Sequence, residues 1–242
     1  MEEHNNAFGY LSEFRKRMIA VAVFFIFALA AGMLFSKKLV LLFLNSNLPG
    51  NVKLVTLSPY ENISLFINFM FFVAIALTIP FAIYQLIAYI KPGLTRNEKK
   101  TAIIIPFIAL LLFTIGAGFG FFATKQIIVP FLSKLTLGIG IVNNWSINQF
   151  MKFVVYLSLA MGLVFQMPLL ILMLVKFNIL KPGQLKKARK HAIIGLLVLA
   201  AVITPTTDWF SLIIMAVPLI LLFEATVFIA KFMRKDKAEA AL

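Results

Sequence analysis

The stretch from Gln85 to Lys100 reads QLIAYIKPGLTRNEKK and marks the point where a long apolar segment gives way to a charged loop. Pro92 and Gly93 are expected to end the preceding helix, because proline lacks the N–H that a helix needs and glycine tolerates the left-handed turn that closes one. Glu98 is the single acid among the bases of this loop, at the first turn of the next predicted helix, where the helix dipole favours a carboxylate. The pattern by itself is typical of a solvated loop between two membrane helices.

The composition is that of a membrane protein. Hydrophobic residues make up 62% of the chain and charged residues only 13%, and the mean hydropathy is +0.98, whereas a soluble domain is close to half apolar. The chain has no cysteine, and its two histidines, His4 and His191, are far apart, so we expect no metal site and no cofactor. The net charge of +14 does not indicate nucleic acid, because the bases are scattered among apolar runs.

Six apolar runs predict an all-α polytopic membrane protein with six transmembrane helices in a single transmembrane domain, residues 1–242. Each of the first four has about 18 residues or more, enough to cross a hydrocarbon core roughly 30 Å thick. The last two are short: the fifth is roughly 20 Å long as a helix, and Glu224 limits the uncharged part of the sixth to roughly 22 Å. We therefore expect a thinned bilayer at that corner. The predicted helices are 18–35, 63–90, 101–123, 150–175, 192–204 and 209–229, followed by a cytoplasmic tail, 230–242.

The segments outside these runs carry two further expectations. Residues 1–17 have an apolar stripe and are predicted to form an amphipathic helix at the membrane surface before the chain turns in. A cleavable signal peptide with a site at Ala28-Leu29-Ala30 is the alternative, although the apolar run continues past that site. The apolar part of the later connection, Ile127 to Leu132, is expected to lie against the membrane surface.

The distribution of bases predicts that both termini are cytoplasmic. With the N-terminus inside, 17 of the 23 lysines and arginines fall on inner segments and 6 on outer ones, as the positive-inside rule requires. Trp145 and Trp209 then both fall at the outer interface, where an aromatic belt is expected.

Polar chemistry is concentrated on the predicted cytoplasmic side, at Glu13 and Glu98. Two carboxylates on one face can bind a pair of guanidinium groups, because each arginine fork matches a carboxylate. Spacing alone favours the alternative that needs no ligand, an internal pair between Glu13 and Arg17 and a helix-start role for Glu98. Glu224 is the one acid inside an apolar run; pairing with Lys231, exposure at the interface and a functional role all remain open for it. Nothing in the sequence indicates an enzyme, since it contains no phosphate loop, catalytic triad or metal motif.

Seven short motifs, in this order along the chain, together resemble the TatC family, the core signal-peptide receptors of the twin-arginine protein translocase. Each motif is weak alone, but the set covers almost the whole chain. The motifs are LSEFRKR at 11–17, TLSPYE at 56–61, YIKPGL at 89–94, NEKK at 97–100, GLVFQMP at 162–168, TPTTD at 204–208 and MAVP at 215–218.

The resemblance implies a concave six-helix receptor in the cytoplasmic membrane of a prokaryote, oligomeric in its working complex. It implies that Glu13, Arg15, Tyr89 and Glu98 bind the twin-arginine signal peptide of a folded cargo protein. It also implies small single-span partners of the TatA type, with or without a TatB-like protein. Asp208 matches an acid that matters in the family, although an aspartate that simply forms a turn is the alternative.

One position departs from the family pattern. The family often has a glutamate before the Met-Pro pair of the fourth helix, and this chain has Gln166, which can donate and accept hydrogen bonds but cannot ionise. Gln166 is expected to form a neutral hydrogen bond to a partner helix or bound peptide, or else to a helix of its own chain. Two other function classes remain: a secondary transporter of a small anion or lipid that uses the two Lys-Pro-Gly loops, and a structural membrane scaffold.

Overall fold

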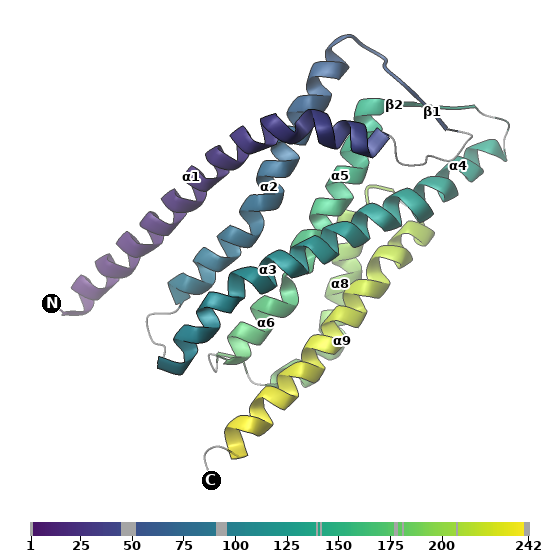
Figure 1. Ribbon diagram of the computed structural model, residues 1–242. Coiled ribbons are helices and arrows are strands. Elements are labelled where there is room, and N and C mark those ends of the chain that lie inside the picture. The colour runs from purple at the N-terminus through teal and green to yellow at the C-terminus, as the bar shows by residue number, and fades with distance from the viewer. Residues whose placement is uncertain are drawn as a thin grey trace. The chain divides into compact units, whose positions relative to one another are not determined.

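The computed structural model describes residues 2–44, 52–90, 96–138, 140, 142–176, 179–180, 182–206 and 208–239, and most of these are helical (Figure 1). The chain forms two compact units. The first comprises residues 1–111 and 143–152, and the second comprises 112–142 and 153–242.

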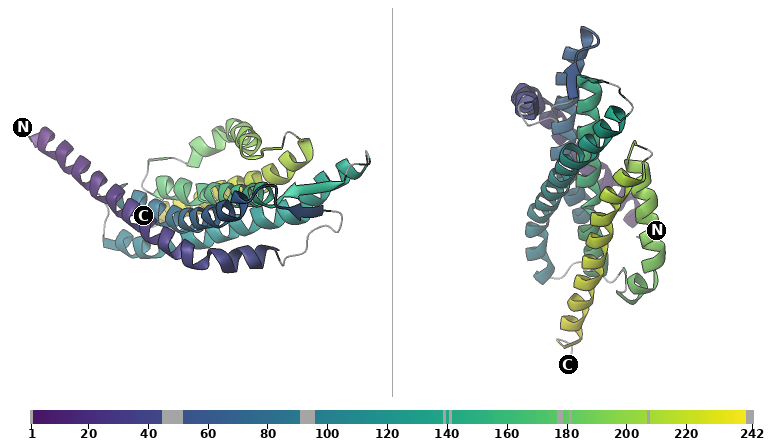
Figure 2. Two further views of the ribbon diagram at one scale, coloured as in Figure 1. Left: turned by 90° about the horizontal axis from the view of Figure 1, so that it is seen from above. Right: turned by 90° about the vertical axis from the view of Figure 1, so that its right-hand side faces the viewer.

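The first unit is built on two long helices, α1 (Glu2–Leu44) and α2 (Tyr60–Ile90), which lie beside each other (Figure 2). The rings of Phe24 and Phe81 stack with centroids 4.3 Å apart. The prediction of a separate surface helix over residues 1–17 is wrong, since α1 runs unbroken through that boundary. The physical reason is that no proline or glycine lies between Tyr10 and Ala31 to bend it.

At Gly32 the backbones of the two helices lie close together. A Cβ atom at Gly32 would lie 2.5 Å from the backbone oxygen of Met70, nearer than a Cβ atom approaches a non-bonded atom in folded proteins. The packing of α1 on α2 therefore requires glycine here.

Replacing Gly32 with valine is expected to separate α1 from α2 and to lower the free energy of unfolding by about 1–3 kcal/mol, the usual cost of overpacking. Thermal unfolding of the purified protein in detergent measures this loss. Gly118 is the matched control, because a Cβ there meets nothing within 4 Å. An unfolding temperature that falls equally for Gly32→Val and Gly118→Val would contradict the packing argument.

A small parallel sheet joins the two predicted outer connections. Strand β1 (Val52–Val55) pairs with β2 (Asn143–Ser146), in a register that runs from Val52 opposite Asn143 to Val55 opposite Ser146. These strands depart from the all-α prediction; each has only 4 residues, and its partner lies in a distant connection, so no local pattern indicates either strand.

In the second unit, the third predicted helix continues well past its expected end at Ala123. Helix α3 (Arg96–Ala123) leads through a π-helical turn, η2 (Thr124–Ile128), into α4 (Val129–Leu137). Pro130 follows the π-helical turn directly and lies in the first turn of α4, and its nitrogen has no hydrogen to donate to the preceding turn. Within the segment Ile127 to Leu132, Ile128 and Val129 are fully buried in the protein, and the location of the segment against the membrane surface stays a prediction. Lys125, which we counted among the outer bases, is also buried, with Nζ 5.7 Å from the ring centroid of Phe121.

The fourth predicted helix is broken near its middle. It forms α5 (Ile147–Val164) and α6 (Met167–Lys176), which are separated at Phe165 and Gln166. Pro168 explains the break, because its nitrogen has no hydrogen to donate to the preceding turn. The Gln166 N–H instead bonds the Leu163 carbonyl at 3.0 Å, in a tighter turn.

The remaining helices are α7 (Pro182–Lys187), α8 (Arg189–Ile203) and α9 (Trp209–Glu239), and α8 lies beside α9. Within the described residues, five helical segments are long and apolar enough to span a membrane. Helix α8 is the sixth apolar helix, and its 15 residues extend for roughly 22 Å, so it is short as predicted. Helix α9 continues past the predicted end at Ile229, while its uncharged part stops before Glu224. The five long segments are Leu11–Lys38, Tyr60–Tyr89, Ile104–Leu137, Ile147–Lys176 and Trp209–Phe232.

Candidate functional site

A groove of about 260 Å³ lies between α1 and α2 in the first unit, and we call it the α1–α2 groove. Its walls are mostly apolar, and its polar groups come from Arg17, Gln85 and Tyr89. It is lined by Phe14, Arg17, Met18, Val21, Ala82, Ile83, Gln85, Leu86 and Tyr89.

Glu13 binds a guanidinium group beside this groove. Arg17 donates from Nη2 to Glu13 Oε1 at 2.7 Å and from Nε to the same oxygen at 3.2 Å. Its third nitrogen, Nη1, donates to Gln85 Oε1 of α2 at 3.0 Å. The side chains of Arg17 and Glu13 are 26% and 38% exposed, so the pair stays in contact with water and is of the weakly stabilising kind.

Two aromatic rings form an apolar wall next to the charged groups of Glu13 and Arg17. Phe14 of α1 meets Tyr89 of α2 edge to face, with ring centroids 5.4 Å apart. The α1–α2 groove therefore offers an anionic group, a side-chain amide and an apolar surface close together. That combination suits a peptide segment that carries a guanidinium group next to an apolar side chain.

The structure brings together only part of the predicted signal-peptide site. Tyr89 lines the α1–α2 groove and Glu13 binds the lining residue Arg17, whereas Arg15 is exposed and is not among the lining residues. Glu98 lies in the first turn of α3, as expected, but its side chain is outside the described part of the molecule. The loop at 91–95 also lies outside it.

Gln166 and Glu224 both lie in the second unit. The side chain of Gln166 is 1% exposed, at the break between α5 and α6. Glu224 forms an ion pair with Arg189, 35 residues away, through Oε2 and Nη2. Of the alternatives left open for Glu224, pairing with Lys231 is therefore wrong, and the partner comes instead from the start of the neighbouring helix α8.

Asp208 caps helix α9. Its Oδ1 accepts a hydrogen bond from the Ser211 N–H at 2.7 Å, which satisfies one of the free donors at the helix start. Burial alone raises the pKa of Asp208, but the Ser211 N–H and the hydroxyls of Thr206 and Ser211 outweigh it and hold the pKa below its usual value. This geometry agrees with the alternative given for Asp208 in the sequence analysis, in which the aspartate simply forms the turn.

Replacing Asp208 with alanine is expected to lower the free energy of unfolding at pH 7 by about 0.5–2 kcal/mol, the usual cost of losing such a cap. Because the pKa of Asp208 is lower in the folded protein, its contribution is complete above the unfolded pKa of about 3.9 and is lost as the pH falls through the folded pKa. Thermal unfolding between pH 3 and pH 7 should therefore show a difference between parent and variant that shrinks in acid. Asp208→Asn is the control, since it keeps a capping oxygen. A difference that stays constant with pH would contradict the charge argument.

Two hydrogen-bonded polar clusters in the first unit were not predicted from the sequence. Glu61 is only 6% exposed; its Oε1 accepts from the Ser146 hydroxyl at 2.8 Å, and its Oε2 accepts from the Leu57 N–H at 2.9 Å. Asn68 of α2 donates to Asn148 of α5 at 2.8 Å, across 80 residues of sequence. The sequence shows Asn68 only as a polar residue within an apolar run, and nothing in the sequence identifies Asn148 as its partner.

These features define a class of protein: multi-spanning helical membrane proteins that have a carboxylate–guanidinium pair beside an apolar groove. A family model for the Sec-independent protein translocase protein TatC matches residues 9–218. TatCd of Bacillus subtilis (strain 168) is 35% identical over 247 residues, which cover 99% of each chain. TatCy of the same organism is 30% identical over 234 residues, covering 96% of this chain and 92% of that relative. A crystal structure described as the twin arginine translocase receptor TatC has a TM-score of 0.75 and 31% identity, covering 92% of this chain and 98% of that one.

The chain therefore belongs to the TatC family. It is a multi-pass membrane component of a Sec-independent protein translocase and not an enzyme. This assignment replaces the transporter and scaffold alternatives.

Proposed function

We propose that this chain is the translocase subunit that binds twin-arginine signal peptides at its cytoplasmic face. The observation that carries the proposal is the contact between Glu13 and the Arg17 guanidinium at the α1–α2 groove. This contact supports Glu13 as an acceptor for an arginine, and the groove lined by Arg17 offers space nearby. The solved relative at 31% identity is described as a twin arginine translocase receptor, which supports the same conclusion.

Binding proceeds by exchange of one guanidinium for another. In the free protein Arg17 occupies Glu13 Oε1 and is also held by Gln85. An incoming arginine replaces Arg17 at Glu13, and a neighbouring apolar side chain enters the α1–α2 groove. Glu98 supplies the second carboxylate, for the second arginine of the peptide. Because the pair at Glu13 is exposed to water, added salt weakens the binding.

The wider function follows from the same family assignment. We propose that the protein lies in the cytoplasmic membrane with both termini inside and exports folded proteins that carry such peptides. It does so with single-span partners of the TatA and TatB types, in an oligomeric complex. The excess of inner bases supports this orientation.

Replacing Arg17 with glutamine is expected to raise the affinity for a twin-arginine peptide by about two- to fivefold. The reason is that the internal competitor for Glu13 is removed, and an exposed pair of this kind contributes up to about 1 kcal/mol. Fluorescence anisotropy with a labelled peptide and the full chain in detergent measures the change. Lys16→Gln is the matched control, since Lys16 is exposed and is not among the groove-lining residues. Weaker binding in Arg17→Gln alone would show that Arg17 assists the peptide and does not compete with it.

The proposal is tested by crosslinking from inside the α1–α2 groove. A photoreactive amino acid at Tyr89 is expected to crosslink a twin-arginine peptide, and one at Glu98 is expected to do the same. The control position is Leu57, which is 68% exposed in the predicted outer connection. Equal labelling from Leu57 and Tyr89, or none from Tyr89 and Glu98, would contradict the proposed site.

A further inference from the structure

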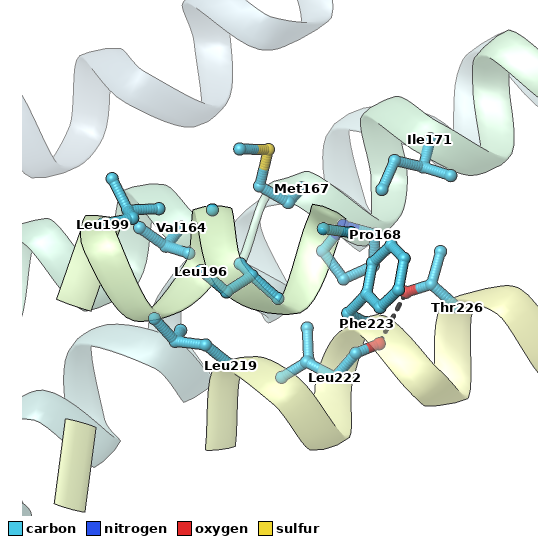
Figure 3. A pocket seen from close by; sticks show the side chains of 12 residues that line it. Val164, Met167, Pro168, Ile171, Leu196, Leu199, Leu219, Leu222, Phe223 and Thr226 are labelled. Carbon is cyan, nitrogen blue, oxygen red and sulfur yellow. Dashed lines mark hydrogen bonds between the residues drawn. The ribbon is translucent and has the colours of Figure 1, made fainter. Parts of the chain in front are cut away.

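The second unit contains a larger groove, of about 410 Å³, which we call the α8–α9 groove (Figure 3). Side chains from α5, α6, α8 and α9 converge on it, and nearly all of them are apolar. Thr226 is the one hydroxyl-bearing residue of the lining, and its hydroxyl is already bonded to the Leu222 carbonyl at 2.7 Å. The walls therefore favour a hydrocarbon occupant. The lining consists of Val164, Met167, Pro168, Ile171, Ala192, Gly195, Leu196, Leu199, Leu219, Leu222, Phe223 and Thr226.

One end of the α8–α9 groove adjoins helix α7. Leu185 of α7 is buried in a cluster that also contains the groove residues Phe223 and Ala192. The two residues after Leu185 are Lys186 and Lys187, and both are exposed. This end of the groove is therefore next to positive charge.

Helix α8 brings further charge to the same end. Its groove face is formed by residues 192, 195, 196 and 199, and Arg189 lies one turn earlier on that face. Lys190 beside it is exposed. Arg189 uses Nη2 to bind Glu224, while its buried Nε atom has no hydrogen-bond acceptor within the part of the chain that the structure describes. A buried donor of this kind requires an acceptor oxygen.

We propose that the α8–α9 groove is a binding site for an anionic phospholipid. An acyl chain fills the apolar groove, and the phosphate and ester oxygens lie at the α7 end. There they accept from Arg189 Nε and face Lys186, Lys187 and Lys190. Basic pockets between membrane helices at the cytoplasmic surface suit anionic headgroups, because charge attraction and apolar burial then act on one molecule.

The combination of charge and shape selects this occupant over a partner helix. A single-span helix would fill the apolar walls equally well, but it would leave Arg189 Nε without an acceptor and would gain nothing from the exposed lysines. An anionic phospholipid satisfies both. The site lies on α5 to α9, and its existence does not depend on the signal-peptide proposal.

Native mass spectrometry of the full chain in detergent tests the proposal, with 1-palmitoyl-2-oleoyl phosphatidylglycerol and the phosphatidylcholine of the same acyl chains as probes. We expect one phosphatidylglycerol molecule per chain to bind about tenfold more tightly than phosphatidylcholine. The variant Lys186→Gln, Lys187→Gln, Lys190→Gln should lose that preference and keep the phosphatidylcholine affinity. The matched control removes three exposed lysines elsewhere, at Lys37, Lys38 and Lys134.

A second variant tests the groove itself. Gly195 lines the α8–α9 groove, and a Cβ there meets nothing within 4 Å, so Gly195→Leu fills the groove without a clash. It should weaken binding of both lipids, whereas Gly118→Leu, at an equally open glycine outside the groove, should not. Equal affinity for both lipids in the parent, equal losses in the two triple variants, or unchanged binding in Gly195→Leu would each overturn the proposal. The proposal would also be overturned if the groove were found to hold a partner helix and no lipid.

Discussion

Replacing Glu13 with lysine is expected to weaken binding of a twin-arginine peptide by about 10- to 100-fold. Charge-assisted hydrogen bonds contribute roughly 1.5–3 kcal/mol, and the substitution both removes the acceptor and introduces repulsion. Glu98→Lys is expected to cause a loss of similar size, through the second arginine of the peptide. Equilibrium binding to the full chain in detergent measures both effects, alongside a test that each variant still inserts in the membrane.

The matched control for Glu13→Lys is Ser12→Lys. Ser12 is exposed and adjacent, so this variant adds positive charge at almost the same place and leaves the carboxylate intact. Its affinity should stay close to that of the parent. If Ser12→Lys and Glu13→Lys lose the same affinity, the effect is one of general charge, and Glu13 is not a specific acceptor.

Replacing Glu61 with leucine is expected to have the largest effect on stability, a loss of roughly 2–4 kcal/mol in the free energy of unfolding. The Ser146 hydroxyl and the Leu57 N–H both donate to this buried carboxylate, and each donor left without an acceptor costs roughly 1–3 kcal/mol. Ser146 is the last residue of β2, so the pairing of β1 with β2 should loosen as well. Thermal unfolding in detergent measures the loss, and limited proteolysis reports on the two connections.

The smaller change Ser146→Ala separates the two bonds of Glu61. It removes the hydroxyl that donates to Glu61 and that accepts from the Gln149 N–H at 3.3 Å, but it leaves the bond from the Leu57 N–H to Glu61 in place, so its loss should be below that of Glu61→Leu. Unfolding of Glu61→Leu at the same temperature as the parent would show that the two strands do not depend on this residue.

Local patterns were sufficient to predict the apolar membrane-spanning segments and one ion pair. An apolar run long enough to cross the thickness of a bilayer predicts a membrane span, whatever packs against it. The short length of α8 was predicted from the number of residues in its apolar run alone. The pairing of Glu13 with Arg17 follows from the spacing of four residues on one helix face, and the structure has it. In each case the cause lies within about one turn of helix or one apolar run.

Contacts between distant segments were not predictable in this way. Gln85 receives a bond from Arg17 across 68 residues, and Arg189 pairs with Glu224 across 35. No periodicity encodes such partners, because packing between helices selects them. The same holds for the pairing of β1 with β2, whose segments are too short to carry an alternating pattern. The continuation of α3 into α4 depends on one π-helical turn, which has no sequence signature.

The most direct test of the account compares two signal peptides that differ only in the motif. One carries the paired arginines and the other carries two lysines in their place, and each is titrated against the full chain in a lipid bilayer. Lysine has the same charge but lacks the planar fork that matches a carboxylate. We predict that the arginine peptide binds at least about tenfold more tightly and that Glu13→Gln removes most of this difference. Equal affinities for the two peptides in the parent protein would contradict the account.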